Sequence, residues 1–191
     1  MKHRTLVLAA LVLLVGVRPL SGTIIDQQVP SFDVAFAVGP VYQQEVIAGV
    51  TGQLMGFDIA PAMTGYSARA FVNLGAPWQA DPNDFETLFT STVQYDWQFI
   101  DTSAANIYLS SGESFVIGIG GPYSGFYFWG AIDSHYPGAL YFDGTPSWPP
   151  TWDIAFRTHV IPEPSMLVLL SIGGACLPIY AWRRRKRPHG G

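Results

Sequence analysis

The chain has 191 residues, of which 49% are hydrophobic and 13% charged. This composition favours one globular domain with accessory segments over a disordered protein. Residues 23–164 hold two basic residues, Arg69 and Arg157, against all 14 acidic residues, which gives this region a net charge of −12. Nucleic-acid binding depends on Lys and Arg that neutralise phosphates, so this charge argues against a nucleic-acid partner.

The first 22 residues have the character of a secretory signal peptide. Lys2 and Arg4 give a positive start, and residues 5–17 form an apolar run that is shorter than the roughly 20 residues of a stable membrane span. Arg18 and Pro19 interrupt the usual cleavage pattern, and the best candidate bond follows Gly22. We therefore predict a signal helix that the secretion machinery uses and removes. An uncleaved N-terminal anchor is the alternative.

Residues 23–160 show the pattern of an all-β domain. Short apolar or alternating runs are separated by Gly, Pro, Asn or Asp, and none keeps a period of 3.6 residues. In the first run, Phe and Val alternate with Asp33, Ala35 and Ala37, so one strand face is expected to be buried. We expect strands at residues 32–38, 42–48, 53–60, 67–74, 88–93, 95–101, 114–120, 126–132, 139–142 and 153–160.

About ten strands with frequent turns predict an antiparallel β-sandwich, with a jelly-roll-like arrangement as the first choice. The order of residues 44–54, 97–99, 111–118 and the final run from Asp153 also resembles the sandwich modules of exported bacterial proteins. Many of those modules resemble carbohydrate-binding domains. The resemblance therefore implies an architecture and leaves the ligand open.

One segment of the body is rich in hard oxygen donors. Asp81, Asn83, Asp84 and Glu86 lie within six residues, and Ca²⁺ prefers carboxylate and amide oxygens on a flexible loop. The segment lacks the spacing and the glycine of an EF-hand loop. A calcium site is one interpretation, and a polar turn with side-chain-to-backbone hydrogen bonds is the other. No other cofactor is expected.

Aromatic residues are concentrated in two places. Residues 123–129 include Trp129, and Trp148 and Trp152 flank a proline turn. Exposed aromatic faces can stack on sugar rings, so these three tryptophans are candidates for sugar stacking. Alternating aromatics in a strand also pack into cores, and the sequence leaves both interpretations open.

The residues that would support catalysis are sparse. The body contains His135, in a loop-like segment, and His159, near the end of the last expected strand, but no Gly-x-Ser-x-Gly element and no His-Glu-x-x-His zinc motif. Cys176 is the sole cysteine, which excludes an intrachain disulfide. With 14 acidic residues, some carboxylates must lie close together by chance, so a close pair would not by itself indicate a site for glycoside hydrolysis. We therefore expect a protein that is not an enzyme.

The C-terminal region, residues 161–191, has three parts. Pro162, Glu163 and Pro164 come first, followed by an apolar stretch at residues 165–182 that is close to the length of a transmembrane helix. A basic cluster follows, formed by Arg183, Arg184, Arg185, Lys186 and Arg187. Because a basic flank stays on the cytoplasmic side, the body is expected to face outward.

This order of elements resembles the PEP-CTERM sorting signal of exported bacterial proteins. The resemblance covers about the last 30 residues and implies a partner, a membrane-embedded exosortase that cleaves near the Pro-Glu-Pro motif. It also implies an association with exopolysaccharide. From the residues alone, the two prolines hold Glu163 in an extended segment where a processing enzyme can reach the backbone. A permanent single-span anchor is the alternative.

Taken together, these features predict an exported protein, first anchored by its C-terminal helix and then released to the cell surface or the extracellular matrix. Its expected role is non-enzymatic binding or adhesion. A carbohydrate-binding module is the first alternative. A glycosidase-like enzyme is the second, and it would need two carboxylates about 5 to 10 Å apart in a cleft.

Overall fold

A computed structural model describes residues 22–37, 41–75, 84–120, 127–147 and 150–163 of the chain. The expected signal helix before Gly22, the expected transmembrane helix at residues 165–182 and the basic cluster lie outside the described residues. Within the described ranges, no helix combines the length and the apolar character that crossing a bilayer requires.

β-Strands and one short 3-10 helix make up the secondary structure of the described ranges. In chain order these are β1 (Ile24–Val29), β2 (Val34–Ala37), β3 (Tyr42–Ile47), β4 (Gly52–Ile59), β5 (Ser67–Asn73), β6 (Phe85–Thr90), β7 (Gln98–Asp101), η1 (Ser103–Ala105), β8 (Tyr108–Leu109), β9 (Ser114–Gly120), β10 (Tyr127–Ala131), β11 (Leu140–Phe142), β12 (Thr145–Pro146), β13 (Asp153–Ile154) and β14 (Phe156–Pro162).

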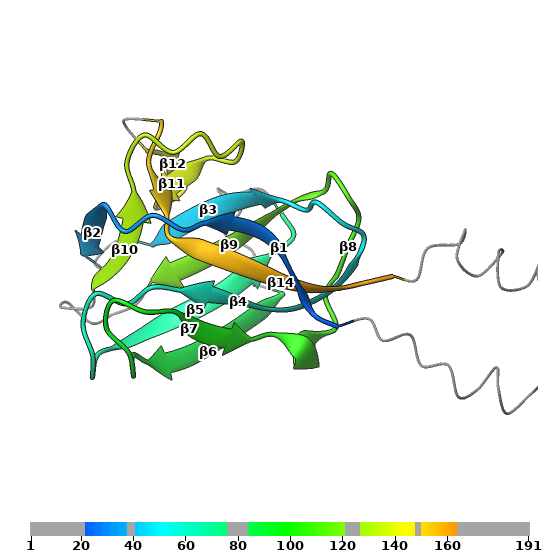
Figure 1. Cartoon of the computed structure of the whole chain (residues 1–191), viewed down its shortest axis with the longest axis horizontal. Coiled ribbons are helices and arrows are strands. Elements are labelled where there is room, and N and C mark those ends of the chain that lie inside the picture. Colours follow the sequence, from blue (N-terminus) through cyan, green and yellow to red (C-terminus); the bar gives the residue numbers. More distant parts are fainter. Residues whose placement is uncertain (1–21, 38–40, 76–83, 121–126, 148–149, 164–191) are drawn as a thin grey trace, which may run out of the picture. The chain divides into compact units, whose positions relative to one another are not determined.

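The strands form three antiparallel sheets, so the prediction of an all-β antiparallel fold is confirmed (Figure 1). The first sheet has the order β1-β14-β4-β7, and β8 also pairs with β4. The second has the order β12-β11-β3-β9-β5-β6, and a small third sheet has the order β13-β10-β2. β14 is therefore an interior strand, flanked by β1 and β4.

One hydrophobic core joins the two large sheets. Phe57 and Phe156 come from the first sheet and Phe115 and Ile117 from the second, and all four are fully buried in the same cluster. Side chains alternate between the two faces of a strand. Phe156, Thr158 and Val160 of β14 therefore point inward and are 0% exposed, while the residues between them point outward.

Three expected strands differ from the structure by three residues or more, each for an identifiable reason. β7 begins at Gln98, three residues after the expected start, because Tyr95 has a positive φ of 57°, which an extended strand does not allow. β6 begins at Phe85, three residues before the expected start, because Phe85, Thr87 and Phe89 form its inward row despite the intervening Glu86. The expected strand at residues 153–160 divides into β13 and β14, which pair in different sheets.

β1 was missed because its alternation is weak. Three of its six residues are exposed and only Val29 is buried, and its pairing with β14 is interrupted by a register shift between Ile25 and Gln28. At this irregularity the fully buried Thr158 hydroxyl accepts a hydrogen bond from the Gln27 backbone N–H at 3.1 Å. An inward side chain of β14 thus provides the partner that the regular strand pairing leaves out.

Candidate functional site

The last strand of the body runs into the Pro-Glu-Pro segment. In β14, Val160 pairs with Leu54, Ile161 with Gln53 and Pro162 with Gly52 of β4. Val160 is also opposite Ile24 of β1. Pro162 is thus the final residue of a paired strand, two residues beyond the expected end of the domain, and the exposed Glu163 follows directly. Pro164 lies outside the described residues.

Gly52 allows the end of β14 to approach β4 closely. A Cβ atom at this position would lie 2.2 Å from the backbone oxygen of Ile161 and 2.8 Å from Cγ1 of Val160. Any side chain would therefore push the two strands apart. The absence of a side chain at Gly52 keeps the residues just before Glu163 in the sheet.

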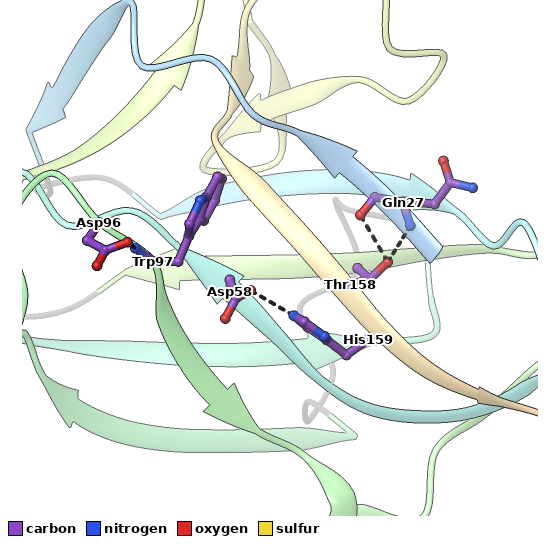
Figure 2. A network of polar contacts seen from close by, with 6 residues as sticks. All are labelled: Gln27, Asp58, Asp96, Trp97, Thr158 and His159. Atoms are coloured by element: carbon purple, nitrogen blue, oxygen red, sulfur yellow. Dashed lines mark hydrogen bonds and ion pairs between the residues drawn. The ribbon is translucent and has the colours of Figure 1, made fainter. Parts of the chain in front are cut away.

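The outer face of the same sheet carries a polar pair. Asp58 of β4 and His159 of β14 are joined by a hydrogen bond of 2.7 Å between Oδ2 and Nε2, and both side chains are largely buried. Figure 2 shows His159 pointing from β14 toward Asp58, with Trp97 nearby. The ring of Phe99, which is 49% exposed, meets His159 edge-on with centroids 5.3 Å apart.

Next to this pair lies a group of stacked side chains that we call the aromatic face: Phe32, Tyr95, Trp97, Trp129 and Arg157. The Arg157 guanidinium lies 4.0 Å from the centroid of the Trp97 ring. Phe32 contacts Trp97 at 5.1 Å and Trp129 at 6.4 Å, and Tyr95 contacts Trp129 at 5.3 Å. The five side chains therefore form one continuous surface, and Tyr95 is its most exposed ring, at 62%.

Two donors of the aromatic face lack hydrogen-bond partners among the described residues. They are Nε1 of Trp129 and Nε of Arg157, and both atoms are buried. Buried donors are normally satisfied, because leaving one unpaired costs about 1–3 kcal/mol. Because both atoms have almost no accessible surface, a ligand on this face would reach them only after the neighbouring side chains move.

The other predicted tryptophans do not join Trp129. Trp152 packs against the core, with its ring 5.7 Å from that of Phe36. Trp148 lies outside the described residues. Trp129 and Trp152 thus belong to separate clusters, and Trp129 alone of the described pair contributes to the aromatic face.

The residues of the expected calcium segment are only partly described. Asp81 and Asn83 lie outside the described ranges. Asp84 accepts a hydrogen bond from the Leu74 backbone N–H at 2.8 Å, and Glu86 forms an ion pair with Arg69 at 3.6 Å. Among the described residues, no group of three or more His, Cys, Asp or Glu side chains is arranged to hold a metal ion.

A cavity of about 350 Å³ is lined by residues 28–31 and 131–137, which include Ser134 and His135. Ser134 hydrogen-bonds to the carboxyl of Asp153, and its hydroxyl accepts from the Tyr136 backbone N–H at 3.2 Å. These contacts give Ser134 a structural role at the cavity wall. His135 is exposed in the same loop.

A buried polar network lies beside this cavity. Gln44 Nε2 donates to Asp153 Oδ1 at 2.7 Å, and Gln44 Oε1 accepts from the Ile154 backbone N–H at 3.1 Å. Burial raises the pKa of Asp153 above its usual value of 3.8, although its bonds to Ser134 and Gln44 work in the opposite direction. Burial likewise raises the pKa of Tyr136 to about 12. Asp153 and Tyr136 are therefore assigned structural roles.

Asp58, Trp97 and Arg157 were not among the site residues predicted from the sequence. A usable signal was present, because Arg157 and His159 are the polar positions of an alternating strand and so share one face. Their partners could not be found in the same way, because Asp58 and Trp97 are about 60 to 100 residues away in the chain.

Comparison with known proteins identifies one feature. Residues 160–186 match the model of the PEP-CTERM protein-sorting motif. The chain therefore carries this sorting motif, as its C-terminal residues suggested, and motifs of this kind mark exported proteins that an exosortase sorts. No curated protein and no solved structure matches the chain significantly.

Proposed function

We propose that this protein is exported, is held in the membrane by its C-terminal helix until an exosortase processes it, and then serves as a non-enzymatic binding or adhesion protein at the cell surface or in the extracellular matrix. The observation that carries the proposal is the sorting motif at residues 160–186, which starts within the last strand of a folded body. A signal peptide at residues 1–22 completes the export route.

The strand order supports a jelly-roll arrangement for this body. The order is β1-β14-β4-β7 in one sheet and β3-β9-β5-β6 in the other. Among these eight strands, taken in chain order, the chain changes sheet at every step except β5 to β6. Two interleaved Greek keys produce this order. In this arrangement the first and last strands are neighbours, so both ends of the body leave from the same side.

Replacing Glu163 and Pro164 together by alanine should stop processing. In the native host, the wild-type chain is expected to lose the apolar stretch and the basic cluster, while the variant keeps them, because the enzyme no longer finds its motif. Intact-mass analysis of membrane and medium fractions measures the difference. Glu86→Ala, at an exposed position within the body, is the matched control and should be processed normally. A wild-type chain whose mass still includes the apolar stretch and the basic cluster would contradict the proposal.

The aromatic face favours carbohydrate as the ligand of the body. An exposed ring such as that of Tyr95 can stack on the C–H face of a sugar. The net charge of −12 in residues 23–164 repels anionic polymers. A neutral polysaccharide, including neutral exopolysaccharide, is therefore the ligand class that this surface suits best.

Tyr95→Ala tests this assignment. Because one aromatic contact contributes about 0.5–1.5 kcal/mol, we expect affinity for a neutral polysaccharide to fall roughly two- to tenfold. Tyr108→Ala is the matched control, since Tyr108 is 57% exposed and lies on β8, away from the aromatic face. Affinity electrophoresis over a panel of neutral and acidic polysaccharides provides the measurement. Equal losses in both variants, or no binding by the wild type, would exclude the aromatic face as the site.

A further inference from the structure

We propose that strand β14 limits where the sorting motif can be cut, so that the processed body always retains Pro162 as part of its last strand. This inference rests on the proposed sorting function and adds the position of the processing site. The cut breaks a peptide C–N bond on the C-terminal side of Pro162. The carbonyl carbon takes a hydroxyl from water, or the nucleophile of an acceptor molecule, and the released amine takes the proton.

The bonds before Pro162 lie within a paired strand: β14 is paired on both sides up to Val160, and Ile161 and Pro162 are paired with β4 alone. Val160 is fully buried and lies between Ile24 of β1 and Leu54 of β4, and Ile161 pairs with Gln53. Enzymes that cut peptides bind them in an extended form, with main-chain hydrogen bonds to the enzyme. Up to Val160 both edges of β14 are occupied, so this part of the strand cannot make those bonds unless it first separates from the sheet. Ile161 and Pro162 must still separate from β4 before this part of the chain can enter an enzyme's site.

Glu163 marks the first point at which the chain is free of this constraint. It is exposed and lies just beyond the last paired residue. Pro162 itself has no N–H to donate, so pairing at this position depends on the close approach of Gly52 and Ile161 rather than on a hydrogen bond from the proline nitrogen. The boundary between protected and accessible backbone therefore falls inside the Pro-Glu-Pro motif.

Gly52 offers a way to move this boundary. Gly52→Val places a side chain where Cβ alone would lie 2.2 Å from the Ile161 oxygen, and so should separate the end of β14 from β4. Thr51→Val puts the same side chain at the neighbouring exposed position and is the control. We expect processed Gly52→Val chains to include products that lack Pro162, Ile161 or Val160, whereas wild-type and Thr51→Val chains keep all three.

The experiment expresses the full-length chains in the native host with its exosortase and determines the C-terminal residue of the mature proteins by intact mass and peptide mass spectrometry. Wild-type ends at or beyond Pro162 support the inference. Wild-type ends upstream of Pro162, or identical ends in Gly52→Val, overturn it while leaving sorting intact. A wild-type precursor that is never shortened overturns the proposed function as well. If Gly52→Val does not accumulate, the wild-type end decides alone.

Discussion

Replacing Phe156 by alanine is expected to lower the free energy of unfolding of the body by about 3–5 kcal/mol. Phe156 is fully buried at the start of β14, pairs in register with Ile59 and meets the Tyr136 ring at 5.2 Å. Its truncation removes a large apolar side chain and leaves a cavity that the surrounding strands fill only in part. Urea unfolding of the exported body, followed by tryptophan fluorescence, measures the loss.

Phe99→Ala provides the matched control for this prediction. Phe99 lies on the outer face of the same sheet and is 49% exposed, so its removal should cost about 1 kcal/mol or less. Equal losses for the two phenylalanines would contradict the assignment of the inner and outer faces. A large loss for Phe156→Ala alone would also reduce the amount of protein at the cell surface, because unfolded exported chains are degraded.

The second large effect concerns the buried carboxyl group of Asp153. Asp153→Ala leaves the Gln44 side-chain amide and Ser134 without their partner, and the free energy of unfolding should fall by about 1–3 kcal/mol at neutral pH. Asp153→Asn keeps an oxygen acceptor facing Gln44 and avoids the burial of a charge. Its stability at neutral pH should therefore be close to that of the wild type or above it.

The same pair of proteins tests the raised pKa of Asp153. Because the pKa is higher in the folded state than the usual 3.8, the folded chain binds the proton more tightly than the unfolded chain. This carboxyl therefore stabilises the fold most at low pH, and the contribution is lost as the pH rises from 3.8 through the folded-state pKa. Unfolding curves at a series of pH values should show that the stability difference, wild type minus Asp153→Asn, declines over this window. A constant difference would disprove the raised pKa.

Local patterns explain why part of the site could be predicted. The Pro162, Glu163 and Pro164 motif, the apolar stretch and the basic cluster are contiguous, so their order alone identified the sorting motif that the family match confirms. Strands such as β3, β5 and β9 were predicted within one or two residues, because each is a largely buried run bounded by glycine-containing turns. β1 was missed because its exposed residues lie on both faces, and the start of β6 was missed because the charged Glu86 stands between its inward residues.

The sequence by itself determined the all-β class, the acidic body and the sorting motif, since each depends on composition or on residues that are neighbours in the chain. Tertiary structure alone decided that Phe32, Tyr95, Trp97, Trp129 and Arg157 form one surface, and that Pro162 belongs to a paired strand. The physical reason is that strand pairing joins segments about 100 residues apart through backbone groups that every residue carries. The order of the side chains therefore says little about which strands become neighbours.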